Sequence, residues 1–102
     1  MIVMDIGNSD TVIGIYKKKK LYKTYRIETK NKNFKKNISD FFKKNIILNL
    51  KSNEKICLIS SVVPEVNKII EFLLKKNSFK IKNINIHNIP KKIKFKYAKS
   101  QL

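Results

Sequence analysis

The first sixteen residues, MIVMDIGNSDTVIGIY, contain the side chains whose types and spacing suggest chemistry. Two β-like runs flank a Gly-Asn turn, which is typical of a hairpin. Asp5 interrupts the first apolar run, and a buried carboxylate stays ionised only beside a cation or hydrogen-bond donors. Gly7 and Asn8 can adopt positive φ, which would let backbone N–H groups converge on an anion. The turn is therefore a candidate anion site.

Oxygen ligands surround the same turn. Ser9 and Thr11 carry hydroxyls that can contact phosphate oxygens, and the carboxylates of Asp5 and Asp10 are hard ligands suited to hydrated Mg²⁺. This pattern predicts a site for magnesium-bound phosphate. The alternative is an ordinary hairpin in which the Asp and Asn side chains cap the turn. The motif is short, so the residues alone leave both interpretations open.

The stretch resembles the start of the type III pantothenate kinases, in which Asp-Ile-Gly-Asn-Ser/Thr-x-Thr forms the first phosphate-binding loop of an actin-like, sugar-kinase and Hsp70 superfold. Residues that follow the family pattern are Asp5, Ile6, Gly7, Asn8, Ser9, Thr11, Val12 and Gly14. Asp10 departs from the pattern, since asparagine is more usual there. The resemblance implies that Asp5 is a metal ligand. It also implies an ATP- and phosphate-binding site made of Asp5, Ile6, Gly7, Asn8, Ser9, Asp10, Thr11 and Val12.

A second matching stretch is Ile-Ser-Ser-Val-Val-Pro, residues 59–64. The hydroxyls of Ser60 and Ser61 can line a cleft at the carboxyl end of a strand, where open α/β sheets bind ligands. They can equally cap the helix that Pro64 begins, and capping is the favoured interpretation.

A weaker match is Arg26-Ile27-Glu28-Thr29, which resembles the Arg-x-x-Thr that ends the third strand in the family. Arg26 can face a nucleotide cleft or pair with Glu28 or another nearby acid. We favour the structural pairing.

Hydrophobic periodicity indicates the elements that must position these residues. Alternation predicts a third strand over residues 21–27, after a solvated turn at Lys17 to Lys20. Apolar residues at three- and four-residue intervals predict a helix over residues 34–50, capped by Asn37 or Ser39. These elements carry no candidate chemistry of their own.

The second half of the chain continues the pattern. Residues 55–60 are typical of a buried central strand. A helix is expected from Pro64 to a stop at Asn77. Near-alternating isoleucines over residues 81–89 predict a fifth strand, and residues 91–102 predict a short edge strand or an extended tail.

The predicted order is β-β-β-α-β-α-β, that of one RNase H-like half of the actin-like fold, and the resemblance implies the same α/β class. Residues 1–102 would be the N-terminal half of a two-lobed kinase whose second lobe is absent from this chain. Tyr97 is similar to the substrate-contacting tyrosine of the family. The general base belongs to a Gly-x-Asp-Arg motif expected beyond Leu102, so no catalytic base is assigned here.

The resemblance implies ATP-dependent phosphorylation of pantothenate to 4′-phosphopantothenate, the first step of coenzyme A biosynthesis, with Mg²⁺ and a monovalent cation, K⁺ or NH₄⁺. The isolated chain is expected to have no useful activity. Its partners would be ATP, pantothenate and either a second copy in a homodimer or a missing C-terminal half. The main alternative is a non-catalytic remnant or interaction module of the same fold.

The net charge suggests a third, less favoured class of function, nucleic-acid binding. The chain carries a net charge of +17, almost all from lysine, with Arg26 as its single arginine. Specific nucleic-acid readers favour clustered arginine, whereas these lysines are scattered among Asn and Ile, as AT-rich codon usage would produce. We therefore expect non-specific binding at low salt but no specific nucleic-acid partner.

The remaining chemistry-bearing residues suggest structural roles. Cys57 is the single cysteine, which rules out an internal disulfide, and its apolar surroundings predict a buried, inert thiol. His87, the single histidine, is expected at a strand end without a catalytic role. The N-terminus lacks signal-peptide features, and no apolar run approaches the roughly 20 residues that span a bilayer. A soluble cytoplasmic protein without a membrane partner is expected.

Overall fold

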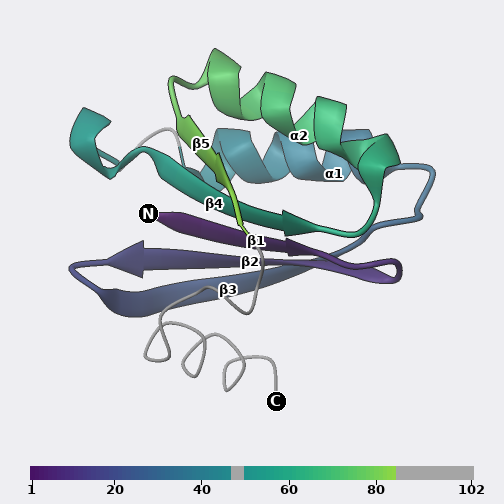
Figure 1. The fold of residues 1–102 in the computed structure, drawn as a ribbon, viewed down its shortest axis with the longest axis horizontal. Coiled ribbons are helices and arrows are strands. Elements are labelled where there is room, and N and C mark those ends of the chain that lie inside the picture. The colour runs from purple at the N-terminus through teal and green to yellow at the C-terminus, as the bar shows by residue number, and fades with distance from the viewer. Residues whose placement is uncertain (47–49, 85–102) are drawn as a thin grey trace.

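The computed structural model describes residues 1–46 and 50–84. Five strands form one mixed sheet in the order β3-β2-β1-β4-β5, and two helices pack on it (Figure 1). The elements in chain order are β1 (Ile2–Ile6), β2 (Asp10–Lys17), β3 (Lys20–Glu28), α1 (Phe34–Phe41), a π-helical turn (Phe42–Ile46), a 3₁₀ turn (Ser52–Glu54), β4 (Ile56–Ser61), α2 (Pro64–Lys76) and β5 (Lys80–Asn83). The predicted order and the actin-like half-domain class are confirmed.

Connection length explains the strand directions. Short turns join β1 to β2 and β2 to β3, and both pairs are antiparallel. Strand β4 returns beside β1 after α1 and runs parallel to it, and β5 runs parallel to β4 after α2. Parallel pairs need such long crossovers, whereas antiparallel pairs need only a hairpin loop. Because β1 and β4 are parallel, their carboxyl ends meet at one edge of the sheet.

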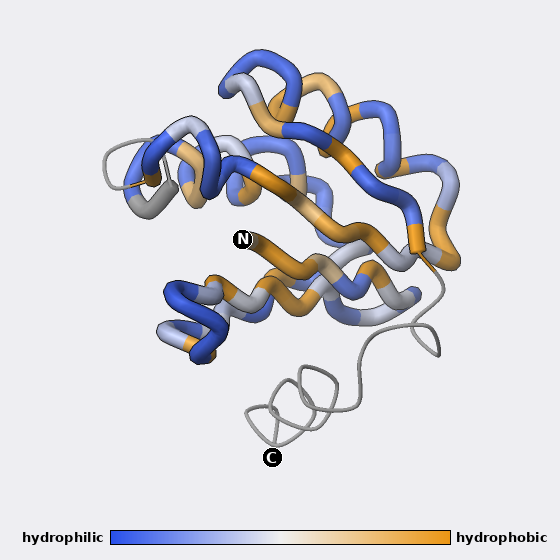
Figure 2. Tube along the Cα trace, turned by 60° about the vertical axis from the view of Figure 1, so that its left-hand side comes forward, coloured by the Kyte–Doolittle hydropathy of each residue, from blue (hydrophilic) through white to orange (hydrophobic). Residues whose placement is uncertain are grey.

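The main core lies between the sheet and the two helices, which cover the same face (Figure 1). Alternate residues of β1, such as Met4, point to this face, and Ile38 of α1 and Ile70 of α2 meet them there, each 0% exposed. Figure 2 shows how strongly apolar β1 and β4 are. Cys57 is also fully buried, and burial raises the pKa of its thiol, so the predicted inert thiol is confirmed.

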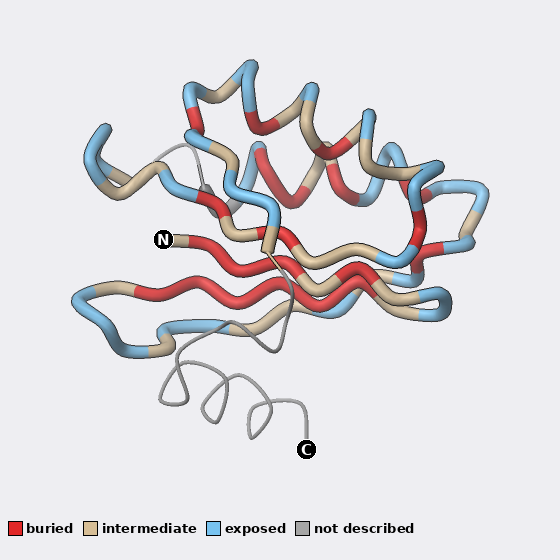
Figure 3. The backbone as a smooth tube through the Cα atoms, viewed as in Figure 1, coloured by how far each residue is buried: buried red, intermediate tan, exposed pale blue. Residues whose placement is uncertain are grey.

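A smaller cluster occupies the opposite face of the sheet. Val3, Val12 and Tyr16 form its buried centre. With buried residues facing both sides, β1 and β2 are buried over most of their length (Figure 3). Leu58 of β4 packs against them. Side chains alternate along a strand, so Asp5 shares this face with Val3.

The first helix starts at Phe34, the first residue of the predicted range, but its N-cap is Asn33 rather than Asn37 or Ser39. The side chain of Asn31 accepts the N–H of Asn33 at 2.8 Å and forms a local turn directly before the helix. The α-helical winding ends at Phe41 and continues as the π-helical turn.

At its far end the predicted helix is too long. Leu50 lies outside any helix and packs partly buried against the core. Residues 47–49 are outside the described part of the chain.

The later elements follow the prediction more closely. Strand β4 is internal to the sheet, and α2 begins with Pro64 at its first turn and ends before Asn77, whose side-chain amide donates to the carbonyl of Leu73 at 2.7 Å. Strand β5 starts at Lys80, and the N–H of Ile84 donates to the carbonyl of Ile59 at 2.8 Å. The rest of the predicted fifth strand, His87 and the tail at residues 91–102 lie outside the described residues.

No helix within residues 1–46 and 50–84 is long and apolar enough to cross a membrane.

The turn between β2 and β3 contains two lysines with strained, left-handed backbone conformations. Lys18 and Lys19 have φ of 51° and 65°, a conformation that favours Asn and Gly. We expect the double change Lys18→Asn, Lys19→Gly to stabilise the fold by about 1–2 kcal/mol, because the left-handed conformation costs a residue with a β-carbon about that much. Urea denaturation at constant m-value measures the gain. Lys18→Gln with Lys19→Gln removes the same charges but keeps both β-carbons, and an equal gain there would identify charge repulsion as the cause instead.

Candidate functional site

The candidate site lies at the sheet edge where β1 and β4 end. Residues 7–9 form the turn after β1, and Ser60 and Ser61 end β4, directly before the loop into α2 (Figure 1). Asp5 pairs with Val12 on one side and with Ser60 on the other. The parallel β1–β4 pairing therefore brings together the two stretches, around residues 5–12 and 59–64, that carry the sequence motifs.

Three backbone hydrogen bonds fix the turn and the end of β1. The N–H of Gly7 donates to the carbonyl of Asp10 at 2.9 Å and closes the hairpin end. The N–H of Thr29 donates to the carbonyl of Ser9 at 2.8 Å, and the N–H of Val62 donates to the carbonyl of Ile6 at 3.0 Å. The turn is thus fixed to the ends of both β3 and β4.

The conformation of the turn corrects one expectation. The sequence predicts positive φ at Gly7 and Asn8, and neither residue adopts it. The N–H of Gly7 is also used within the hairpin. Asn8 and Ser9 are exposed, and their N–H groups donate to no acceptor among the described residues. These two amides are the backbone donors that the turn offers to an anion.

Glycine is needed at position 7 for space. A β-carbon there would lie 3.1 Å from the carbonyl oxygen of Asp10, closer than most real contacts. We expect Gly7→Ala to destabilise the fold by about 1–2 kcal/mol, since the added methyl group must push the hairpin end apart. Urea denaturation measures the loss. Asn8→Ala is the control, because it changes an exposed side chain of the same turn. Wild-type stability in Gly7→Ala would contradict the steric argument.

Asp5 is half-buried at this edge. Burial raises the pKa of its carboxyl group, because desolvation disfavours the charged form. No ion pair joins it to a lysine or arginine within the described residues. Burial therefore makes the charged carboxylate of Asp5 less stable, and no protein cation among the described residues compensates. A bound metal ion would stabilise this charge.

Asp10 has a different environment. Its Oδ2 accepts a hydrogen bond from Nη1 of Arg26 at 2.7 Å, an ion pair exposed to solvent. The favoured structural role of Arg26 is thus confirmed, with Asp10 rather than Glu28 as the partner. Arg26 and Asp10 lie on adjacent strands, β3 and β2, so sequence distance alone does not identify the pair.

Three predicted site residues are mostly enclosed. Thr11 is 0% exposed, and its hydroxyl is 2.8 Å from the hydroxyl of Thr29. Ile6 and Val12 are 1% and 5% exposed, on opposite faces of the sheet. In this structure all three hold the hairpin in place, and the side chains of the candidate site that reach solvent are those of Asp5, Asn8, Ser9 and Asp10. Tyr97 lies outside the described residues.

The two serines of β4 have separate roles. Oγ of Ser61 accepts the N–H of Val63 at 3.1 Å and donates to Oδ1 of Asn67 at 2.7 Å, so it ties the loop after β4 to α2. No side chain among the described residues accepts a first-turn N–H of α2, so the favoured capping role is wrong. Ser60 lies beside Asp5 in the β1–β4 register and on the same face of the sheet. The sequence alone makes both serines candidates for the cleft and cannot separate them, because it does not reveal the strand pairing.

The donor set fits magnesium better than a metal held wholly by protein. Residues 1–46 and 50–84 contain no group of three or more His, Cys, Asp or Glu side chains that could hold a metal ion. Mg²⁺ commonly keeps several waters and uses one or two carboxylates plus substrate phosphates. Asp5 supplies such a carboxylate beside the free amides of Asn8 and Ser9.

Comparison with known proteins agrees with this geometry. The sequence pattern of the family described as "Type III pantothenate kinase" matches residues 1–102. A type III pantothenate kinase from Kosmotoga olearia is 35% identical over 78 residues, which are 74% of this chain and 30% of that protein. The chain thus spans about a third of the length of this curated relative. Because the family pattern matches the chain over its whole length, the chain belongs to the type III pantothenate kinase family.

Proposed function

We propose that the chain supplies the first phosphate-binding loop of an enzyme that transfers phosphate from ATP to pantothenate. The observation that carries the proposal is the carboxylate of Asp5, half-buried without a protein cation among the described residues, beside the exposed turn at Asn8 and Ser9. Family membership supplies the reaction: 4′-phosphopantothenate would form as the first step of coenzyme A biosynthesis.

The roles follow from what phosphoryl transfer requires. Such reactions depend on positioning and charge neutralisation more than on covalent chemistry by the protein. The amides of Asn8 and Ser9 would bind phosphate oxygens, and Asp5 would hold Mg²⁺ or one of its waters. When bound, Mg²⁺ neutralises phosphate charge. Ser60, beside Asp5, is placed to hydrogen-bond to the same water shell.

The neighbouring residues would keep the loop in register. Thr11 is bonded to Thr29, and Ile6 and Val12 are packed within the sheet. The ion pair with Arg26 would position Asp10 at the rim of the loop. We assign these residues to the phosphate site as supports of its backbone.

The remaining parts of the proposal rest on the family. Tyr97 would contact pantothenate, and K⁺ or NH₄⁺ would assist ATP binding. A further segment would form the second lobe of each subunit and supply the general base, which must lie within hydrogen-bond reach of the pantothenate hydroxyl. The enzyme would be a homodimer in the cytoplasm.

A chimera tests the proposal. The chain replaces the matching segment of the Kosmotoga olearia protein, and ADP release is measured with and without pantothenate. We expect pantothenate-dependent turnover in the chimera and none from the 102-residue chain alone. A folded chimera without turnover would favour a non-catalytic module, whereas turnover by the chain alone would show that the second lobe is dispensable.

A further inference from the structure

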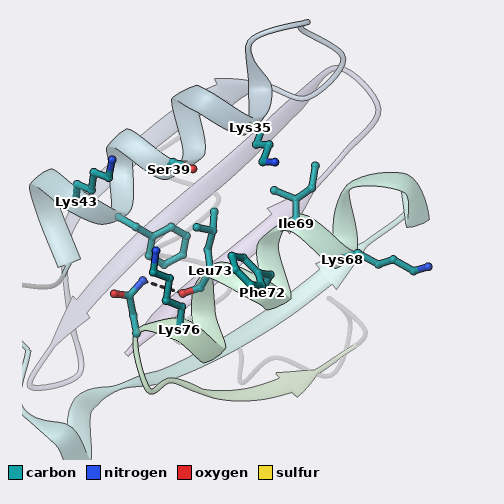
Figure 4. A pocket seen from close by; sticks show the side chains of 10 residues that line it. Lys35, Ser39, Lys43, Lys68, Ile69, Phe72, Leu73 and Lys76 are labelled. Atoms are coloured by element: carbon teal, nitrogen blue, oxygen red, sulfur yellow. Dashed lines mark hydrogen bonds between the residues drawn. The ribbon is translucent and has the colours of Figure 1, made fainter.

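A groove runs between α1 and α2, in the helix layer rather than at the sheet edge of the candidate phosphate site (Figure 4). Its volume is about 590 Å³. The residues that line it are Lys35, Ser39, Phe42, Lys43, Lys68, Ile69, Phe72, Leu73, Lys76 and Asn77. Pockets for small ligands in proteins span roughly 300–1,000 Å³, so the groove is of suitable size.

The floor of the groove is apolar. Phe72 is 65% exposed, and in Figure 4 its ring lies in the groove beside Leu73, with Ile69 one turn earlier on α2. An exposed aromatic side chain in a hollow with apolar neighbours favours binding of another apolar group. A ligand that covered this ring would remove it from water.

The rim of the groove is positively charged. Lys35 and Lys43 reach it from the α1 side, and Lys68 and Lys76 reach it from α2. The acids of the two helices do not line it: Asp40 lines a separate hollow against β3, and Glu65 and Glu71 are absent from the groove. Lysine is abundant throughout the chain, but the residues that line this groove include four lysines and no acid.

We propose that the groove binds an amphiphilic anion, a small molecule with an apolar body and a carboxylate, sulfonate or phosphate group. The apolar body would cover Phe72, and the acidic group would lie at the lysine rim, where lysine stems pack on apolar surface while their ammonium groups stay in water. This site is separate from the phosphate loop. The proposal does not depend on kinase activity.

Two fluorescent probes test the proposal on the 102-residue chain. Anilinonaphthalene sulfonate has an aromatic body and an anionic group, and N-phenyl-1-naphthylamine has the same body without the charge. We expect saturable binding of the sulfonate, at least about fivefold tighter than the uncharged probe and weakened by added salt. Amide chemical shifts should change mainly in α1 and α2.

Variants locate the site. Phe72→Ser should weaken sulfonate binding about tenfold, because the ring supplies most of the apolar contact. Lys43→Gln with Lys76→Gln should weaken it several-fold and reduce its salt dependence. The matched control is Tyr22→Ser, which removes an equally exposed ring, 64% exposed, that lies under Lys17 on the far hairpin. Unfolding midpoints of all variants confirm that each is folded.

Three results would overturn the proposal. One is sulfonate binding that Phe72→Ser leaves unchanged, and another is equal weakening by Tyr22→Ser. The third is conversion of a dimer to a monomer by Phe72→Ser, which would make the groove a contact between two copies of the chain.

Discussion

Replacing Asp5 with asparagine is expected to weaken magnesium-dependent ATP binding by the chimera and to raise the midpoint of thermal unfolding of the chain at pH 7. Both effects have one cause. The carboxylate is half-buried and has no protein cation within the described residues, so its charge costs folding free energy in the absence of metal. Asparagine keeps the shape and removes the charge. In the chimera, we expect kcat to fall about 10²–10³-fold, as for the loss of one preorganised electrostatic group.

The effect of Asp5 on the free energy of unfolding should depend on pH. Burial raises the pKa of Asp5 above its ordinary value of 3.8. The native state then binds protons more tightly than the unfolded state, so this group's contribution to stability falls as the pH rises from 3.8 through the native pKa. At pH 7 the whole cost is present. It is below about 1 kcal/mol, because solvent screens a partly exposed charge. The advantage of Asp5→Asn should therefore vanish below pH 3.8.

Asp40→Asn is the matched control, since it removes an acid on α1, away from the turn. It should leave magnesium-dependent ATP binding by the chimera unchanged in calorimetry. If Asp5→Asn lowered the unfolding midpoint at pH 7, Asp5 would be stabilised by a partner in the apoprotein, and its assignment as a metal ligand would fail.

Phe42→Ala is expected to cause the largest loss of stability, about 3–5 kcal/mol, as is typical of buried aromatic residues. Phe42 is 1% exposed and starts the π-helical turn. Its ring meets Phe41 edge-on at 5.6 Å between centroids and Phe79 at 6.3 Å. It thus joins the first helix to the segment after α2. Domains of this size have only about 5–15 kcal/mol of stability, so this single change should remove a large share of it.

Phe72→Ala is the control for this prediction, because Phe72 lines the same groove but is 65% exposed. Its unfolding free energy should stay within about 0.5 kcal/mol of wild type. Urea denaturation measures both variants, with a lower midpoint and an unchanged m-value expected for Phe42→Ala. Equal losses in the two variants would mean that the groove closes over Phe72 in solution.

Local patterns in the sequence are enough to establish the class of fold and to predict where the candidate phosphate loop lies. Periodicity is a local property, so the apolar run of β1, the helical stripe of α2 and the stop at Asn77 can be read directly. The Asp-Ile-Gly-Asn-Ser motif is also local, and its residue types and spacing suffice to indicate the family. Element ends are less predictable: Asn33, not Asn37 or Ser39, precedes the first helix, and the side chain of Asn31 forms a local turn there instead of a helix cap.

Which residues share the site depends instead on strand pairing, which no local pattern contains. The partners of Asp10 and Thr11, Arg26 and Thr29, are 16 and 18 residues away, and strand register rather than sequence spacing brings them together. The same register separates Ser60, beside Asp5, from Ser61, whose hydroxyl bonds to the loop and helix that follow β4. Side chains alternate across a strand, so a shift of one residue would exchange the two serines.

The lack of a protein cation beside Asp5, among residues 1–46 and 50–84, is likewise a property of the folded chain. A lysine-rich sequence offers many possible partners for this carboxylate, and none of them can be excluded from the order of residues alone. Burial and ion pairing depend on what packs against a residue, and that is set by the sheet and the helices together.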